Sequence, residues 1–193
     1  MSRETAGITI LILIMGLATG CGSPRPAPPP AEEPAISGDE DAGGVRIEGG
    51  RVVNQDAAYS FDLPQGWSMS DDVSETRMVV IEKDGSDAAF AVFVKPATAD
   101  LDGELEQLRA TLVDSPSQYE VLEVSRRTID GLPAASLLTA HVMNEGPRLT
   151  QNYVLVRGDV TYVLGCEMAD DEAGEIAPIV ERIVASFRLA PVG

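Results

Sequence analysis

The chain has 193 residues, with 31 acidic and 14 basic side chains, and a formal net charge of -17 at pH 7. Such a surface repels phosphate backbones and anionic lipid headgroups. The composition therefore argues against nucleic-acid binding and against membrane adsorption through protein charge. The length suits one folded domain with extensions.

Residues 1–20 are predicted to be a lipoprotein signal peptide. The run from Ile8 to Ala18 is apolar, too short to span a bilayer and well suited to a signal-peptide core. It leads into Leu17-Ala18-Thr19-Gly20-Cys21, which resembles the bacterial lipobox except that Ala18 stands where leucine is commoner. We therefore expect Cys21 to be lipidated. The alternative is an ordinary secretory signal followed by a chance cysteine.

Residues 21–50 are predicted to be a tether. Prolines crowd residues 24–34, and acidic side chains follow, so the segment is expected to be extended, solvated and unable to fold alone. A tether directly after a lipidated cysteine holds a domain off a membrane without spanning it. We expect the protein to be anchored in the cell envelope by its N-terminal lipid, facing the periplasm or the cell exterior.

The remainder, residues 51–193, is predicted to form the folded domain, with a first short strand within residues 45–53. Alternating apolar residues predict strands over residues 59–63, 77–83, 88–95 and 119–129. A helix is expected over residues 100–113, because four leucines recur there at helical spacing: Leu101, Leu105, Leu108 and Leu112.

The clearest turn is Gly158-Asp159, because glycine tolerates the positive φ of a two-residue hairpin. The resulting register places Leu155 opposite Tyr162. Period-two alternation then assigns the more apolar face to the core. That face carries Leu149, Tyr153, Leu155, Val160, Tyr162, Leu164, Cys166 and Met168.

A further strand is predicted over residues 134–143, followed by a four-residue turn at 144–147. This loop length places Val142 opposite Leu149 and His141 opposite Thr150. Leu138, Ala140 and Val142 are then expected to join the core face. His141, Thr150 and Glu167 then form a row on the less apolar face. A one-residue slip would remove that row.

The last element is predicted to be an amphipathic helix, with apolar residues recurring from Ile176 to Phe187. Pro178 is awkward inside it, so the regular helix either starts near Glu175 or kinks at the proline. Strands, helix, strands and helix in this order predict an α+β fold with helices on an antiparallel sheet. Valines on the less apolar face favour a three-layer α/β/α sandwich.

Three stretches resemble the PsbP/Mog1-like superfamily: Tyr59-Ser60-Phe61-Asp62-Leu63-Pro64-Gln65-Gly66-Trp67, Gly131-Leu132-Pro133-Ala134, and the final hairpin and helix ending at Phe187. The resemblance covers about residues 59–189 and implies an α/β/α sandwich. The chain looks most like the DcrB-like bacterial lipoproteins, which mostly lack a defined activity. Other branches bind photosystem II or a small GTPase, so the resemblance implies no functional residue.

Catalytic and metal-binding chemistry has little support. The row of His141, Thr150 and Glu167 suits either a Thr-His-Glu set or a polar cross-strand ladder, and a flat strand face without an oxyanion loop favours the ladder. Cys166 falls on the core face, where a cysteine behaves as a small hydrophobe. No zinc, calcium or phosphate-loop spacing is present, so no cofactor is expected.

Tyr59 and Trp67 have two interpretations. Trp67 either caps the edge of the core or, with Tyr59, anchors a protein interface. The candidate interaction surface also includes His141, Thr150 and Glu167. We expect a non-enzymatic envelope lipoprotein that binds an unidentified envelope protein. The alternative is a carrier of a lipid or small apolar ligand, and a weaker one is a hydrolase using His141.

Overall fold

The computed structural model describes residues 44–70, 78–115 and 119–191. The folded unit comprises residues 43–193. The predicted signal peptide, Cys21 and most of the predicted tether lie outside the described residues.

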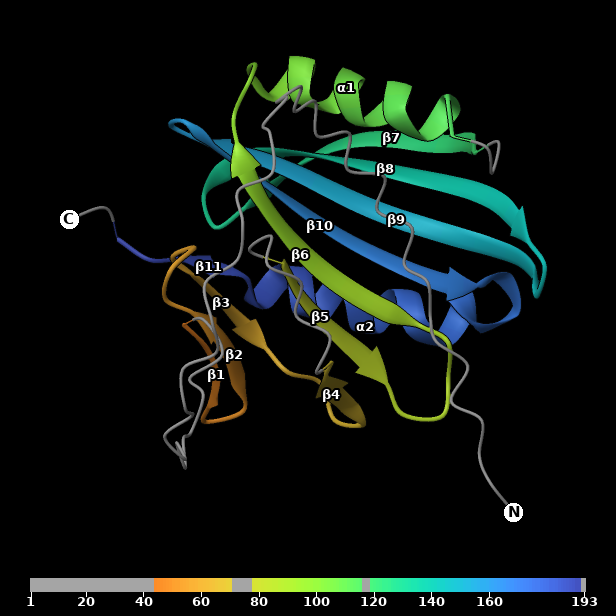
Figure 1. Ribbon diagram of the computed structural model, residues 1–193, viewed down its shortest axis with the longest axis horizontal. Coiled ribbons are helices and arrows are strands. Elements are labelled where there is room, and N and C mark those ends of the chain that lie inside the picture. The colour runs from red at the N-terminus through yellow and green to blue at the C-terminus, as the bar shows by residue number, and fades with distance from the viewer. Residues whose placement is uncertain (1–43, 71–77, 116–118, 192–193) are drawn as a thin grey trace, which may run out of the picture. The chain divides into compact units, whose positions relative to one another are not determined.

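The larger of two sheets is antiparallel throughout and has seven strands among the described residues (Figure 1). The strands are long at one edge and short at the other. Their spatial order is β4 (Trp67–Met69), β5 (Met78–Lys83), β6 (Ala89–Pro96), β10 (Val160–Ala169), β9 (Gly146–Arg157), β8 (Leu132–Met143) and β7 (Glu120–Ile129).

A second, smaller sheet was not predicted. Its order is β1 (Val45–Glu48), β2 (Arg51–Asn54), β3 (Tyr59–Asp62) and β11 (Arg188–Leu189). The single strand expected over residues 45–53 is instead a hairpin, because Gly49 and Gly50 both adopt positive φ and reverse the chain. The folded part therefore begins inside the predicted tether. Arg51 Nη2 also donates to the Ser186 carbonyl oxygen at 3.0 Å.

The predicted register of β9 and β10 is confirmed: Leu155 pairs with Tyr162, Tyr153 with Leu164 and Leu149 with Met168. The predicted four-residue turn before β9 is wrong. Met143 pairs with Gly146, whose φ is positive, so the turn closes on two residues and the register shifts by two. His141 consequently lies opposite Arg148 rather than Thr150. A shift of two leaves every side chain on its predicted face.

Helix α1 (Leu101–Val113) begins at the cap residue Asp100, whose carboxylate accepts a hydrogen bond from the Gly103 amide at 3.0 Å. Its leucine stripe packs as predicted, with Leu105 against Ala135 and Leu137 of β8. The sheet face beneath this helix is called the α1 face below.

Glu104 ties α1 to the loop that precedes it. Its side chain is 1% exposed, and its Oε1 accepts hydrogen bonds from the Thr98 amide at 2.7 Å, the Thr98 hydroxyl at 2.9 Å and the Ala99 amide at 3.2 Å. Its Oε2 lies 2.5 Å from Lys95 Nζ on β6. Burial opposes ionisation of Glu104, but these partners outweigh it and hold the pKa of Glu104 below its ordinary value.

Helix α2 (Ala173–Ser186) follows a 3-10 turn, η1 (Asp170–Glu172). It begins at Ala173, before the predicted start, and continues through Pro178. Its apolar stripe is buried as predicted, and the residues below 3% exposure are Ile176, Val180, Ile183 and Val184.

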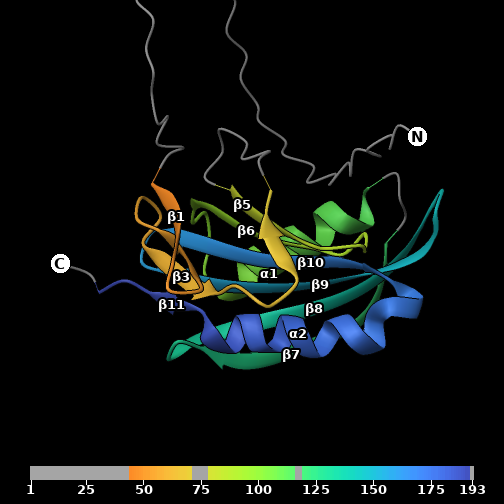
Figure 2. The ribbon, with the colours of Figure 1, turned by 90° about the horizontal axis from the view of Figure 1, so that it is seen from below.

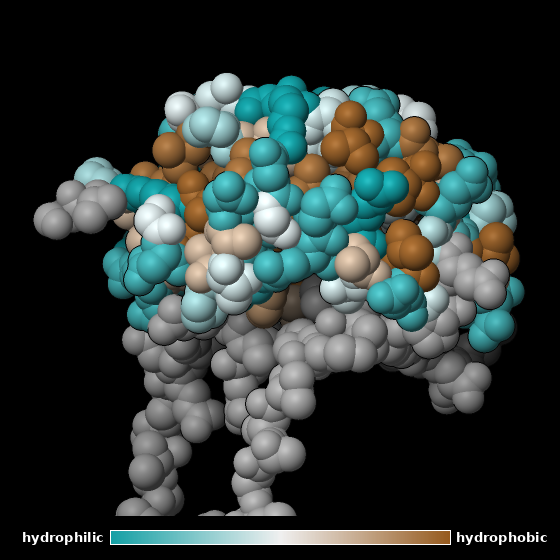
Figure 3. Space-filling view, turned by 90° about the horizontal axis from the view of Figure 1, so that it is seen from above, coloured by the Kyte–Doolittle hydropathy of each residue, from teal (hydrophilic) through white to brown (hydrophobic). Residues whose placement is uncertain are grey.

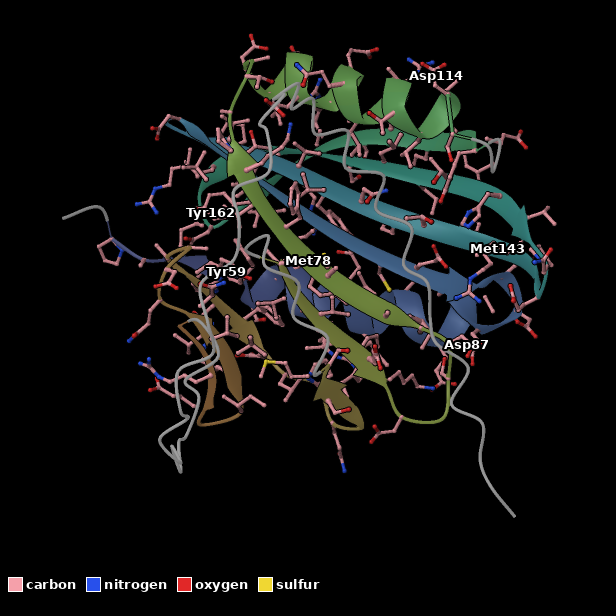
Figure 4. The ribbon with its side chains drawn as sticks, viewed as in Figure 1. Tyr59, Met78, Asp87, Asp114, Met143 and Tyr162 are labelled. Carbon is pink, nitrogen blue, oxygen red and sulfur yellow. The ribbon has the colours of Figure 1, made fainter. Side chains whose placement is uncertain are left out.

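The two helices lie on opposite faces of the large sheet, as Figures 1 and 2 show. Neighbouring residues of β7 demonstrate this, since Arg126 pairs with Asp102 of α1 and Arg127 pairs with Glu181 of α2. The main core lies between the large sheet, α2 and the small sheet. Tyr59 and Tyr162 meet edge-on there, with ring centroids 6.3 Å apart (Figure 4). The α+β fold is therefore confirmed.

Candidate functional site

The predicted polar row assembles on the α1 face, with one residue that sequence reasoning missed. His141 Nε2 lies 3.8 Å from Glu167 Oε2, and Thr150 pairs directly with Glu167. Arg148 enters between them, with its Nε 3.0 Å from Glu167 Oε1. Its Nη2 donates to the backbone carbonyl of Asp87, at the turn between β5 and β6, at 3.0 Å.

Burial governs the electrostatics of this cluster. His141 is 4% exposed, and its ring lies 4.2 Å from that of Tyr119. Burial, with a smaller contribution from Arg148, holds the pKa of His141 below its ordinary value, so the ring is neutral at pH 7. Burial raises the pKa of Glu167, although the Arg148 guanidinium acts in the opposite direction. Among the described residues, neither His141 nitrogen has a hydrogen-bond partner.

The cluster has the geometry of a structural ion pair. General-base catalysis needs the base within about 3.2 Å of the group that it deprotonates. The 3.8 Å between His141 and Glu167 is too long to orient the imidazole, and the Thr150 hydroxyl has no partner among the described residues. Arg148 and Glu167 instead neutralise each other across β9 and β10.

Cys166 is fully buried in the main core. Burial, helped by the neighbouring Glu167 carboxylate, raises the pKa of the Cys166 thiol to about 12. A thiol that stays protonated and enclosed is unreactive. This agrees with the expectation that Cys166 packs as a small apolar side chain.

Tyr59 and Trp67 do not form an exposed surface. They are 2% and 5% exposed, because both point from their short strands into the core. Tyr59 stacks on Phe187 with ring centroids 5.4 Å apart and accepts a hydrogen bond from Asn54 at 3.3 Å. Of the two interpretations of Trp67, the core one fits the structure, and the interface-anchor one does not.

A cleft that the sequence did not indicate lies between α2 and the large sheet. Its volume is about 120 Å³. Alanines at Ala173 and Ala177 leave this space because they are the smallest side chains on that side of the helix. The lining residues are Leu138, Leu149, Gln151, Tyr153, Met168, Ala173, Ala177, Val180 and Glu181.

One end of the cleft is closed by polar contacts. The Tyr153 hydroxyl donates to Glu181 Oε1 at 2.7 Å, and Arg127 Nη1 donates to both Glu181 oxygens at 3.0 and 2.9 Å. The Arg127 guanidinium also lies 5.1 Å from the centre of the Tyr153 ring. These contacts fix α2 against β7 and β9 and leave the Arg127 charge fully compensated.

An apolar strip continues from the cleft along β8. Leu138 lines the cleft, so alternation places Ala140 and Val142 on the same face. Val142 is 73% exposed, the highest value among the exposed large apolar side chains. The cleft and this strip together are called the α2 groove. Figure 1 shows α2 behind β6 and β10, with β8 and β7 extending past the helix.

The alternation of β8 predicted the correct face for this strip but the wrong environment. Leu138, Ala140 and Val142 were expected to join the core, and α2 leaves Val142 uncovered. No local signal in the sequence reports how far a helix reaches across a sheet. Other exposed apolar residues, Val113, Leu122 and Val124, belong to α1 and β7, where Figure 3 shows hydrophobic patches interrupted by hydrophilic ones.

Within the described ranges, no three histidine, cysteine or carboxylate side chains are placed to hold a metal ion. Nor does any helix of the described part combine the length and apolar character needed to cross a membrane.

No family model and no curated protein matches the sequence. Solved structures do match. Cyanobacterial PsbP from Synechocystis is 15% identical, with 80% of this chain and 98% of that chain covered and a TM-score of 0.58. LpqN, described as involved in cell envelope biogenesis of Mycobacterium tuberculosis, is also 15% identical, with 69% and 83% covered and a TM-score of 0.58. A Pseudomonas aeruginosa protein of unknown function is 11% identical, with 69% and 92% covered and a TM-score of 0.52. The chain therefore has a PsbP-like fold.

Proposed function

We propose that the protein is a lipid-anchored accessory protein of the bacterial cell envelope, of the DcrB-like kind, which binds another envelope protein through the α2 groove. The observation that carries this proposal is the groove itself. It combines a 120 Å³ cleft with an apolar strip that ends at the 73% exposed Val142. The involvement of LpqN, which shares the fold, in cell envelope biogenesis supports an envelope role.

The dimensions of the groove favour a protein partner. Interfaces concentrate their binding energy where a few side chains fill pockets, and neighbouring contacts exclude water. A cleft of about 120 Å³ is the size of one apolar side chain. Ligand pockets usually measure about 300–1,000 Å³, so this cleft does not suit a lipid carrier.

The anchor rests on the sequence around Cys21. The lipobox-like residues place a lipid at the start of the tether, and the Pro-rich and acidic composition keeps the folded unit away from the bilayer surface. Such an anchor would present the folded unit to a partner in the periplasm or at the cell exterior.

Site-specific photocrosslinking in cells that express the full chain tests the proposal. With p-benzoylphenylalanine in place of Val142, we expect one discrete crosslinked product that mass spectrometry identifies as an envelope protein. The matched control places the same group at Arg109, which is 51% exposed on α1. The product should disappear when Ala177→Leu fills the cleft, and remain with Ala110→Leu on α1. Equal products from both positions, or none from Val142, would rule out the groove.

Anchoring is tested separately. Cys21→Ser should release the protein from the membrane fraction, whereas the unmodified chain should stay there in high salt and leave only with detergent. Unchanged fractionation of the variant would remove the lipid anchor from the proposal.

A further inference from the structure

Carboxylates from β7, the β8–β9 turn, α2 and η1 lie around the α2 groove. On β7, Glu123 pairs with Leu138 and Glu120 pairs with Ala140, so both carboxylates flank the apolar strip on its own face. Glu145 lies exposed at the tip of the β8–β9 hairpin, and Glu181 lines the cleft with its side chain 50% exposed. The turn η1, which carries exposed Asp170 and Asp171, contacts β9 at the same end of the groove as Glu145, because Ala169 pairs with Arg148 and Arg148 pairs with His141.

Arg127 compensates the charge of Glu181, so the net negative charge of this rim comes from the carboxylates of β7, the β8–β9 turn and η1. Arg127 is held by both oxygens of Glu181 and by the Tyr153 ring, so it carries no spare charge. Arg148 belongs to the α1 face, where it pairs with Glu167. Within the described part of the chain, the groove is thus an apolar channel between carboxylates.

We infer that the α2 groove recognises a positively charged, extended polypeptide segment that places one apolar side chain in the cleft. This inference rests on the proposed function and names the chemistry of its partner. The apolar strip from Leu138 to Val142 follows a strand, so it is about 13 Å long at roughly 3.3 Å per residue. Four residues of an extended segment cover that length, and lysine or arginine side chains on either side reach the carboxylates.

The attraction between one rim carboxylate and a cationic side chain of the partner is modest, and it adds to the apolar contact in the cleft. An exposed ion pair contributes about 0.2–1 kcal/mol, so reversing one rim carboxylate should weaken binding roughly two- to fivefold. The attraction is screened over about 10 Å at 0.1 M salt, so binding should weaken as salt is added.

The test is a methyl NMR titration of the chain from Gly22 to Gly193 with a capped hexapeptide, Lys-Ser-Leu-Ser-Lys-Lys. We expect the methyl signals of Leu138, Val142 and Ala177 to shift, and to shift less when alanine replaces the leucine of the probe. A probe with glutamate in place of each lysine should shift none of them. Glu123→Lys should lower the affinity roughly two- to fivefold, whereas Glu106→Lys on α1, 68% exposed, should leave it unchanged.

Equal shifts from the anionic probe, or no groove shifts from the cationic one, would overturn the inference. That failure is separable from failure of the proposed function. If Val142 crosslinks an envelope protein while the cationic probe leaves the groove signals unmoved, the binding role stands and the charge preference falls. If Val142 captures nothing, the binding role fails first.

Discussion

Removal of the Glu104 carboxylate should be among the most destabilising single substitutions in α1. The side chain is 1% exposed and satisfies two backbone amides, a hydroxyl and the Lys95 ammonium. Each buried donor left without a partner costs about 1–3 kcal/mol, and breaking a buried ion pair costs about 3–5 kcal/mol. Because these terms overlap, Glu104→Ala should lower the free energy of unfolding by about 3–5 kcal/mol.

Urea denaturation followed by circular dichroism measures this loss. Glu106→Ala is the matched control, since Glu106 lies two residues along the same helix and is 68% exposed, so its loss should stay within about 0.5 kcal/mol. Glu104→Gln keeps an acceptor for the two amides and should cost less than Glu104→Ala. If Glu104→Ala and Glu106→Ala were equally stable, the role assigned to the buried carboxylate would be wrong.

Three further predictions concern acid stability, thiol reactivity and backbone packing. In the folded protein the pKa of Glu104 lies below its ordinary value of 4.5. The ionised carboxylate therefore contributes fully to the free energy of unfolding above pH 4.5, and this contribution is lost as the pH falls through the folded pKa. Glu104→Gln should flatten this part of the plot of stability against pH. Cys166 should resist a thiol reagent in the native state and react fully in denaturant, and rapid native labelling would contradict its burial. Gly165→Ala should cost about 1–3 kcal/mol, because its Cβ would lie 2.9 Å from Asn152 Oδ1. Gly174→Ala, with nothing within 4 Å, should instead be neutral or stabilising by up to about 1 kcal/mol, and equal losses at both glycines would contradict the crowding argument.

The hairpin of β9 and β10 could be predicted in full because Gly158-Asp159 allows one turn geometry and the flanking alternation agrees with it. The turn before β9 could not be predicted, because Asn144, Gly146 and Pro147 all favour turns and the sequence does not indicate which two residues form the loop. His141 and Glu167 were still expected on one face, since a shift of two preserves alternation.

Neither the α2 groove nor the small sheet could be predicted from local patterns in the sequence. Alternation along β8 fixes which face Val142 occupies, but the reach of α2 across that face depends on tertiary packing. Strand β11 has two residues and pairs with β3, so no periodicity indicates it. Arg148 was missed as a partner of Glu167 because the predicted register placed it outside the row.

The pairing of β3 with β11 has a consequence for the order of folding. Ser60 meets Arg188 in this ladder, and Arg51 reaches the carbonyl of Ser186, 135 residues further along the chain. The hairpin of β1 and β2, the first among the described residues to be synthesised, therefore needs the end of α2 and β11 before its sheet can close. Contacts at such long sequence separation slow folding, because loop closure precedes any gain from pairing. A chain whose small sheet closes late stays unfolded for longer after synthesis, which would suit the proposed export of the protein across a membrane before the domain forms.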